Sequence, residues 1–413
     1  MTGFSLVNDE LLCDGAALTS IADAVGTPVY VYSSSVIRAR YQELDAAFGG
    51  HPHAIHYALK ANSTLAIARL LQSLGSGADA NSIWEIDVAR RAGFAASDIV
   101  FTGVGKSLAE LECAVALGVK AINVESTGEL ARVEAIAQRT GVVARVAIRL
   151  NPDIDAKSHP HISTGLKVNK FGVAMEDTAD LFASLAHRKA LKLVAIHIHV
   201  GSQITSLEPI TRAGALIARL AVSLKASGHP LEYLDVGGGL GISYDGRHVP
   251  TLTDYVTTIL SELRNLGLPI VVEPGRSLVG PAGALIARVI DLKPRDASSE
   301  FAVIDAGMTE LMRPALYSAF HGIEPVQPRS RPEQPYEVVG PVCESSDVVG
   351  RDRKLPRLEV GDLVAIRDAG AYGSAMASNY NRRPMPPEVL VEGGAWRVIR
   401  RRQTVDDMLA MEL

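Results

Sequence analysis

Short runs of β-branched and other apolar residues alternate with amphipathic helical segments between about residues 53 and 276. Such alternation is typical of parallel strands joined by crossover helices. We expect strands at His56–Leu59, Gly77–Ala80, Ile99–Thr102, Ala121–Val124, Ala144–Leu150, Leu193–His199, Tyr233–Val236 and Ile270–Glu273. Helices are expected after nearly all of them, at Thr64–Leu74, Ile83–Ala92, Leu108–Leu117, Gly128–Gln138, Asp177–Leu185, Leu207–Leu224 and Asp254–Leu266.

The number of these units favours a closed barrel. Eight of them in roughly 220 residues fit a (β/α)8 TIM-like barrel, a fold of about 250 residues. A doubly wound open sheet is the structural alternative, which periodicity alone does not exclude.

The pattern changes after Gly280-Pro281. Extended segments follow, separated by turns rich in Pro, Gly and Arg, at Leu285–Leu292, Phe301–Asp305, Tyr336–Gly340 and Leu363–Asp368. They indicate a mostly β domain, a sandwich or barrel. We therefore expect an α/β plus β protein with a barrel over residues 31–280 and a β domain over residues 1–30 and 281–413.

Charge and cysteine content narrow the class of protein. The net charge of −5 gives no basic surface for nucleic acid or an anionic membrane, and no apolar run reaches the ~18 residues of a membrane span. The three cysteines are too scattered for a disulfide framework or a Cys-x-x-Cys metal site. The N-terminus lacks the pattern of a secretory signal. A cytoplasmic protein that binds neither nucleic acid nor membrane is expected.

Barrel enzymes carry their reactive groups at the carboxyl ends of the strands. In HYALKAN, residues 56–62, Lys60 ends an apolar strand just before a helix. Partial burial there would lower its pKa and make it a Schiff-base nucleophile. A solvated loop lysine is the alternative for Lys60 taken by itself, and the segments below argue against it.

Two further strand ends suit a phosphorylated ring cofactor. In LDVGGGLG, Gly237, Gly238 and Gly239 let backbone N–H groups approach a phosphate, although a plain tight turn has the same composition. In EPGRS, Glu273 could hydrogen-bond a protonated ring nitrogen, Gly275 could donate its N–H to phosphate, and Arg276 could reach a phosphate or carboxylate. A surface Glu–Arg pair is the alternative.

The segment HIHVGS places two histidines on one face of a strand. His197 and His199 could ligate a metal, but no carboxylate or thiol cluster accompanies them in the sequence, so no metal is expected. His199 is the candidate to stack on a ring and Ser202 the candidate to bind phosphate. His197 is expected to be a core histidine.

The predicted β domain carries GPVCESSD, with Cys343 and Glu344, and a Gly-bracketed turn with Tyr372. For a lone cysteine, inert burial is the usual alternative to reactivity.

Taken together, these segments resemble the diaminopimelate decarboxylases, which belong to the fold-type III pyridoxal-phosphate enzymes with a barrel and an alanine racemase-like β domain. The matching segments follow in order over nearly the whole chain: YALKAN at 57–62, HPHISTGLKVNKFGV at 159–173, HVGSQI at 199–204, LDVGGGLGISY at 234–244, EPGRSLVG at 273–280, LMRPALYSAFHGI at 311–323, CESSD at 343–347 and the Tyr372 turn.

For the cofactor, the resemblance implies pyridoxal 5'-phosphate. Lys60 resembles the lysine that forms an imine with it and His199 the stacking histidine. Glu273 resembles the partner of the ring nitrogen. The other implied cofactor contacts are Ser202, Gly237, Gly238, Gly239, Gly275, Arg276 and Tyr372.

For the substrate, the resemblance implies meso-2,6-diaminopimelate, converted to L-lysine and CO2 in the last step of lysine biosynthesis. Arg276, Arg313, Tyr317 and Tyr372 would bind it, and Glu344 would read its distal end. Cys343 would reprotonate the carbanion. The family's active sites are shared across a homodimer.

Two other functions stay open: a related decarboxylase of another basic amino acid, and a non-catalytic cofactor-binding homologue. One segment departs from the family pattern, since NSIWEI stands at 81–86 where SGGEL-like residues are usual. We expect Trp84 in it to serve packing.

Overall fold

The computed structural model describes residues 3–156, 164–166, 169–296 and 299–412. The chain divides into two compact units. One, called the barrel unit below, comprises Tyr41–Ile242 and His248–Gly275, and the other, the β unit, comprises Met1–Arg40, Ser243–Arg247 and Arg276–Leu413. Part of the segment at 159–173 lies outside the described residues.

The barrel unit is built on a parallel sheet that closes on itself. Its strands run in the order β9-β11-β12-β13-β5-β6-β7-β8, and β8 pairs with β9 to complete the ring. Their bounds are β5 His53–Ala58, β6 Gly77–Ala80, β7 Ile99–Phe101, β8 Ala121–Val124, β9 Ala144–Asn151, β11 Leu191–Ile198, β12 Tyr233–Asp235 and β13 Ile270–Val272, with the short β10 Val173–Ala174 beside β9. The predicted barrel is confirmed and the open sheet is excluded.

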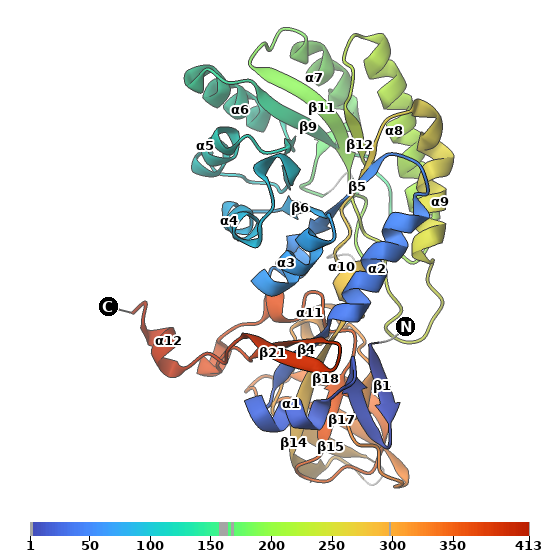
Figure 1. Ribbon diagram of the computed structural model, residues 1–413, viewed down its shortest axis with the longest axis vertical. Coiled ribbons are helices and arrows are strands. Elements are labelled where there is room, and N and C mark those ends of the chain that lie inside the picture. The colour runs from blue at the N-terminus through green and yellow to red at the C-terminus, as the bar shows by residue number, and fades with distance from the viewer. Residues whose placement is uncertain (1–2, 157–163, 167–168, 297–298, 413) are drawn as a thin grey trace. The chain divides into compact units, whose positions relative to one another are not determined.

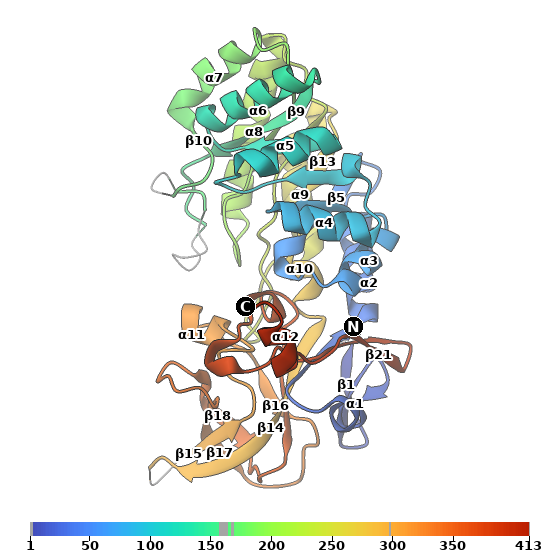
Figure 2. The ribbon, with the colours of Figure 1, turned by 90° about the vertical axis from the view of Figure 1, so that its left-hand side faces the viewer.

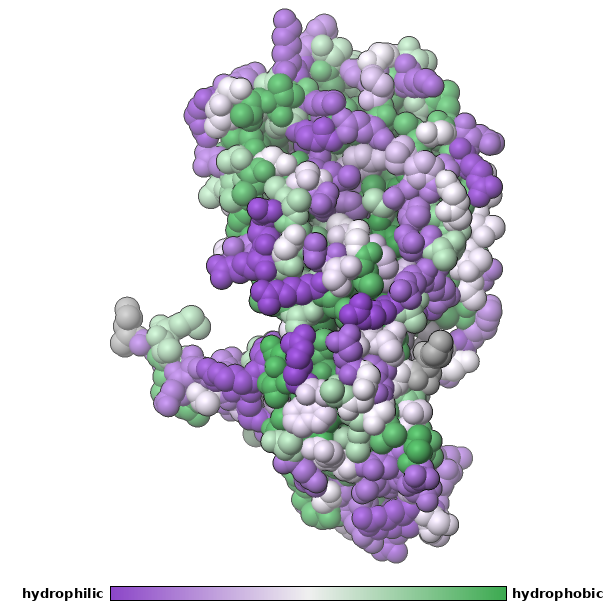
Figure 3. Space-filling model, in the orientation of Figure 1, coloured by the Kyte–Doolittle hydropathy of each residue, from purple (hydrophilic) through white to green (hydrophobic). Residues whose placement is uncertain are grey.

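Helices follow the strands along the chain and surround them (Figure 1). They are α3 Leu65–Ser73, α4 Ile83–Ala92, α5 Leu108–Leu117, α6 Thr127–Thr140, α7 Thr178–Leu185, α8 Glu208–Ala226 and α9 Leu252–Leu263. Local sequence fixes their ends. In α5, Ser107 and Glu110 form a capping box, and Gly118 ends the helix in the left-handed conformation. On the face shown in Figure 3, polar and apolar side chains are interspersed.

Most barrel strands are buried along their length, as expected for parallel strands covered by helices. All residues of β6 and β8 are buried, although β6 contains an aspartate, Asp79, and β8 an asparagine, Asn123. A buried carboxylate needs a partner. The partner of Asp79 is Lys60.

The β unit holds an antiparallel-rich sheet whose main path is β18-β17-β15-β14-β4-β20-β21, with β16 and β19 off that path (Figure 2). The bounds are β4 Val29–Ser33, β14 Gly283–Pro294, β15 Glu300–Ile304, β16 Ile323–Pro325, β17 Glu333–Val339, β18 Val348–Pro356, β19 Leu363–Ile366, β20 Glu388–Glu392 and β21 Ala395–Arg400. A small sheet, β1 Phe4–Val7, β2 Glu10–Cys13 and β3 Ala16–Ala17, precedes them. The remaining helices are α1 Leu18–Val25, α2 Ser34–Ala47, α10 Arg276–Val279, α11 Arg313–Tyr317 and α12 Val405–Leu409.

The amino-terminal segment is integral to the β unit. Strand β4 pairs with β14 on one side and β20 on the other, and all its residues are buried. Its continuous apolar run, VYVYS, lacks the alternation that marks a half-exposed strand, and it is absent from the strands expected from the sequence. None of the described helices is long and apolar enough to cross a membrane.

One ion pair is buried inside the barrel unit. Lys106 Nζ lies 2.6 Å from Glu129 Oε1 and also donates to the carbonyls of Gly103 and Asn123. Both side chains are 2% exposed. Burial lowers the pKa of Lys106 and raises that of Glu129, and each partner opposes the shift of the other.

We predict that Lys106→Met lowers the free energy of unfolding by about 3 kcal/mol, because it leaves the Glu129 carboxylate buried without its cation. The measurement is urea denaturation followed by circular dichroism. Arg139→Met is the control, since its ion pair with Glu112 is exposed and is expected to contribute less than about 1 kcal/mol. Equal effects of the two substitutions would contradict the prediction.

Candidate active site

Lys60 stands at the carboxyl end of strand β5, in the short turn that leads toward α3. The hydroxyl of Tyr57 donates to the carbonyl of Asn62 at 2.9 Å and holds this turn closed. The Lys60 side chain is 34% exposed, and its Nζ lies 3.1 Å from Asp79 Oδ2. The amine is therefore accessible at the barrel end and is oriented by a buried anion.

Asp79, on the neighbouring strand β6, was not among the expected site residues. Its side chain is fully buried. Burial raises the pKa of its carboxyl, Glu273 adds to this effect, and Lys60 together with the Thr102 hydroxyl opposes it. The ion pair with Lys60 thus partly offsets the cost of burying this carboxylate.

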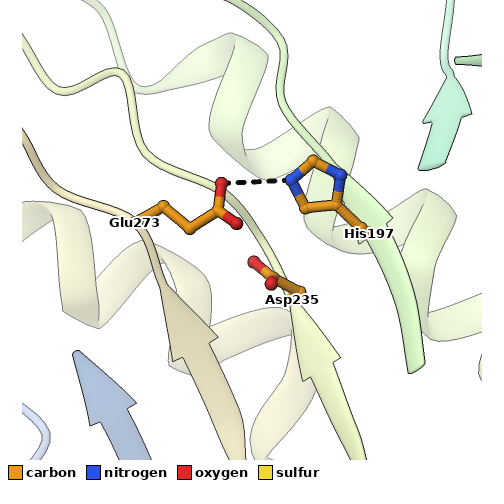
Figure 4. Close-up of side chains that lie close together, drawn as sticks. All are labelled: His197, Asp235 and Glu273. Carbon is orange, nitrogen blue, oxygen red and sulfur yellow. Dashed lines mark hydrogen bonds and ion pairs between the residues drawn. The ribbon is translucent and has the colours of Figure 1, made fainter. Parts of the chain in front are cut away.

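Glu273 follows strand β13 and lies in a second buried cluster with His197 and Asp235 (Figure 4). His197 Nε2 is 3.1 Å from Glu273 Oε2, and both side chains are essentially inaccessible to solvent. Desolvation opposes ionisation of Glu273, but the contact with His197 and the charge of Lys60 outweigh it and bring the pKa of Glu273 well below its usual range. Glu273 is therefore a carboxylate at neutral pH.

His199 follows β11 and is kept neutral by its surroundings. Burial, then the charges of Lys60 and Arg149, lower the pKa of its imidazole well below the usual value. The Gly238 N–H donates to His199 Nδ1 at 3.1 Å, which leaves the ring proton on Nε2. A neutral, fixed ring can stack on another aromatic ring without adding charge.

The triple glycine is required by close backbone contacts. A Cβ on Gly238 would lie 2.1 Å from the carbonyl oxygen of Glu273. A Cβ on Gly239 would lie 2.2 Å from the carbonyl oxygen of Gly201, and its φ of +104° disfavours any other residue. The backbone after β12 therefore packs directly on the segments that carry Glu273 and Ser202.

Ser202 is half-buried on a loop tied to the glycine segment. Ile204 N–H donates to the Gly239 carbonyl, and Gly241 N–H donates to the Ile204 carbonyl, both at 2.9 Å. The side chain of Gln203 donates to the carbonyl of Ile242 at 2.6 Å. Through these bonds of its neighbours, the loop that carries Ser202 is held against the glycine segment. A phosphate site shared by Ser202 and the glycines requires this proximity.

In the β unit, Arg276 begins α10 and is held by two tyrosines. Its Nη1 donates to the Tyr244 hydroxyl at 2.6 Å, and its guanidinium carbon lies 4.7 Å from the centre of the Tyr372 ring. Tyr372 adopts a φ of +58°, a conformation that bulky residues rarely adopt. The strained turn thus presents the Tyr372 ring to the Arg276 guanidinium.

Arg313 is the second buried arginine of this unit. Its guanidinium lies 4.5 Å from the centre of the Tyr244 ring, and its Nη1 is 2.7 Å from His321 Nε2. The other ring nitrogen of His321 is 2.8 Å from the Arg367 carbonyl. Burial, then Arg313, lowers the pKa of His321 to about 3. The neutral ring therefore donates to Arg367 through Nδ1 and accepts from Arg313 through Nε2. Tyr317 lies at the end of the same helix, α11, and is half-buried.

Cys343 and Glu344 lie on an exposed loop after β17. Asp347 shapes this loop by accepting from Val342 N–H at 2.7 Å and Met308 N–H at 2.6 Å. The Tyr380 hydroxyl donates to Glu344 Oε1 at 2.8 Å. The thiol and the carboxylate are therefore presented outward on an ordered turn, and inert burial does not describe Cys343.

The structure brings the expected residues together in two groups. In the barrel unit, Lys60, His199, Ser202, Gly237, Gly238, Gly239, Glu273 and Gly275 all lie at or just beyond strand ends. In the β unit, Arg276, Arg313 and Tyr372 share one cluster around Tyr244, while Cys343 and Glu344 lie on their own loop. Their roles remain predictions.

In the barrel unit, sequence reasoning missed Asp79, Asp235 and the bond between His197 and Glu273. In the β unit, it missed the contacts of Tyr244 and His321 with the two arginines. Asp79 and Asp235 were recognisable as charges inside apolar strands, GADA and YLD. His197 is buried as expected, but it belongs to the site because it contacts Glu273.

The segment at 81–86 forms the start of helix α4, with Ser82 as its cap. Glu85 accepts from the Asn81 N–H at 2.7 Å. Trp84, which was expected to serve packing, is 73% exposed, so most of its side chain makes no packing contact within this chain. A first-turn position on the outer face of the helix explains this exposure.

Comparison with known proteins identifies the family. The model of the pyridoxal-dependent decarboxylase, pyridoxal binding domain, matches residues 34–280. Among curated relatives, a diaminopimelate decarboxylase of Neisseria meningitidis is 45% identical over 98% of this chain and 99% of that protein. One from Helicobacter pylori is 47% identical over 94% of this chain and 96% of that protein.

Solved structures agree with this result. The diaminopimelate decarboxylase of H. pylori complexed with L-lysine superposes with a TM-score of 0.92 at 46% identity, covering 95% of this chain and 98% of that one. The enzyme of M. jannaschii in complex with L-lysine gives a TM-score of 0.95 at 36% identity, covering 100% and 99%. The chain therefore belongs to the diaminopimelate decarboxylases, within the family of pyridoxal-dependent decarboxylases.

Proposed function

We propose that the protein decarboxylates meso-2,6-diaminopimelate to L-lysine and CO2, with pyridoxal 5'-phosphate as cofactor. The observation that carries this proposal is the pair of buried contacts at the barrel end, Lys60 with Asp79 and Glu273 with His197. They provide an accessible amine and a fixed carboxylate, the two groups that this cofactor needs. The name of the relatives, diaminopimelate decarboxylase, supports diaminopimelate as the substrate of this chain.

The residues of the barrel unit fit the cofactor. The absence of a Cβ at Gly238 and Gly239 lets the backbone after β12 pack against the loop that carries Ser202, so backbone amides and a hydroxyl lie on adjoining segments. Glu273 is ionised and can accept from a ring N–H. Lys60 would hold the aldehyde carbon, His199 the ring face, and Ser202 with the glycines and Gly275 the phosphate.

When bound, pyridoxal phosphate withdraws electrons from the substrate carbon that loses CO2. Glu273 maintains the proton on the ring nitrogen, which makes that withdrawal stronger. Asp79 orients the Lys60 amine and stabilises its charge whenever the amine is free. His199 contributes its ring face and no charge.

The β unit supplies groups that suit a substrate with two amino-acid ends. Arg276 and Arg313 offer guanidinium donors to carboxylate, and Tyr317 and Tyr372 offer hydroxyls. Glu344 can accept from the distal ammonium. Cys343 is the proposed donor of the proton that replaces CO2 at the substrate carbon.

We further propose a cytoplasmic homodimer in which the partner copy supplies Cys343 and Glu344. The exposure of both residues on an ordered loop supports this arrangement.

The substrate is tested by CO2 release from meso-diaminopimelate, ornithine and L-lysine. We expect kcat/KM to favour meso-diaminopimelate by at least about a hundredfold, because the other two lack the distal carboxylate and would leave buried donors unpaired. Equal or better turnover of ornithine or L-lysine would favour the alternative, a decarboxylase of another basic amino acid. No CO2 from any of them would favour a non-catalytic homologue.

Sharing of the active site is tested by mixing two variants. Lys60→Ala and Cys343→Ala should each reduce kcat by at least about a thousandfold. Subunit exchange at equal concentrations should restore about a quarter of wild-type activity, because half of the dimers would be hybrids with one intact site. Cys113→Ala, on the barrel helix α5, is the control that keeps full activity alone. No recovery in the mixture would contradict a shared site.

The orienting role of His321 is tested by substitution. His321→Leu removes the acceptor of the Arg313 bond and should raise KM for meso-diaminopimelate by about tenfold with a smaller change in kcat. Because the pKa of His321 is about 3, its charge state and its contribution should not change between pH 6 and 9 in the wild type. The control is His187→Leu, on the exposed surface of the barrel unit. A loss confined to kcat would contradict a role in holding the substrate carboxylate.

A further inference from the structure

Two buried carboxyl groups face each other beside the proposed cofactor site. Asp235 ends strand β12 and Glu273 follows strand β13, which pairs with β12. One ligand atom each of Asp235, Glu273 and His197 lies within 4.8 Å of the others. Figure 4 shows the oxygens of Asp235 directed toward the Glu273 carboxyl.

The hydrogen bonds of this cluster leave one oxygen of each acid without a partner. Glu273 Oε2 contacts His197 Nε2, and Asp235 Oδ1 accepts from the Gly237 N–H at 3.0 Å. Among the described residues, Glu273 Oε1 and Asp235 Oδ2 are buried and have no hydrogen-bond partner if both acids are ionised. Two adjacent buried carboxylates would repel each other. A proton shared between them removes the repulsion and also gives each of the two oxygens a hydrogen-bond partner.

The neighbours indicate which acid carries the proton. His197 lies against Glu273, and the charge of Lys60 also favours the Glu273 anion. Asp235 instead lies near the carboxyls of Glu273 and Asp79, which both disfavour its anion, while the Gly237 amide favours that anion. Placing the proton on Asp235 therefore costs less free energy than placing it on Glu273.

We propose that Asp235 is a neutral carboxylic acid whose Oδ2–H donates to Glu273 Oε1 and, with His197, keeps Glu273 ionised and fixed. Asp235 is then a positioning residue that acts on the cofactor through Glu273. This role rests on the proposed function of Glu273 as the partner of the ring nitrogen. A carboxylate oxygen can accept two hydrogen bonds, so Glu273 retains capacity for the ring N–H.

The pKa direction agrees with this assignment. Burial, then the charge of Glu273, raises the pKa of Asp235 well above its usual value. The titratable groups around the pair are Asp79 on β6, His197 and His199 on or after β11, Lys60 after β5, His56 on β5, Tyr233 on β12 and Tyr255 on α9. Burial also raises the pKa of both tyrosines, which therefore remain neutral at physiological pH.

The direct test is infrared spectroscopy of the cofactor-loaded protein, labelled with 13C at the aspartate side-chain carboxyl. At neutral pH we expect a carboxylic-acid C=O band that shifts with the label and is lost in Asp235→Asn. The same spectrum for wild type and Asp235→Asn would overturn the proposal. So would one tightly bound metal ion per chain in elemental analysis that the substitution removes, because a metal would replace the proton.

A second readout uses the matched variants Asp235→Asn and Asp235→Leu. The asparagine can accept from Gly237 and donate to Glu273 without any charge. It should therefore keep the absorbance of bound cofactor and its pH profile, while leucine should weaken cofactor binding by about tenfold. Loss of cofactor binding in both variants would overturn the proposal, because asparagine keeps a neutral donor to Glu273 and an acceptor for the Gly237 N–H, whereas leucine has neither.

The pH dependence of unfolding gives an independent check. A folded-state pKa raised above the unfolded value means that wild type loses stability as pH rises from about 4 toward the folded pKa. Asp235→Asn removes this loss, so its unfolding midpoint relative to wild type should increase with pH over that range. Asp98→Asn, at an exposed position, is the control and should show no such trend. A relative midpoint that falls with rising pH would show that Asp235 is ionised.

These outcomes are separate from the substrate test. The infrared band and the unfolding trend report the charge of Asp235 whatever amino acid is decarboxylated. Failure of the CO2 assay would therefore leave the proton assignment standing as a structural fact, and the reverse also holds.

Discussion

Charged side chains inside the barrel unit must be paired, because an isolated ion in a low-dielectric interior is costly. Lys60 meets Asp79, Glu273 meets His197, Lys106 meets Glu129, and Arg149 meets Glu125 at 2.8 Å. The pairs differ in exposure. The Lys106 pair is closed on all sides, while the Lys60 side chain is 34% exposed at the barrel end. Of these two lysines, only Lys60 is accessible enough to exchange its carboxylate partner for another group. An amine that binds a cofactor must be able to make this exchange.

Closure of the barrel determines which residues become neighbours. Strand β5, which precedes Lys60, pairs with β13, which precedes Glu273, although the two are far apart in sequence. The backbone after β12 approaches so closely that Gly238 has no space for a Cβ. The glycines thus serve packing of the strand ends as much as access for a phosphate. Two of their amides already have partners, Asp235 for Gly237 and His199 for Gly238, so a bound phosphate would compete with or rearrange around the His199 bond.

The sequence predicted the barrel well because its signals are local. Alternating segments placed every barrel strand within a few residues, and Ile83–Ala92 and Leu108–Leu117 match helices α4 and α5. Strand β4 was missed because its run of buried residues has no period. Site residues at strand ends could be found from position and residue type. Asp79 and Asp235 could not be assigned, because their significance depends on neighbours from other strands. His321 lies in the segment 311–323 that matches the family pattern, but its bond to Arg313 depends on the turn after α11.

The β unit solves a different electrostatic problem, since it places two guanidinium groups on one tyrosine ring. Arg276 and Arg313 lie 5.8 Å and 4.5 Å from the centre of the Tyr244 ring, whose electron-rich face offsets part of their repulsion. A protonated His321 would add a third cation and remove the acceptor of the Arg313 bond, so its lowered pKa is necessary for the arrangement. We expect the repulsion that remains to be relieved if a carboxylate binds. The charges already fixed in the fold would then favour an anion, and two planar guanidinium groups suit a carboxylate better than a single point charge.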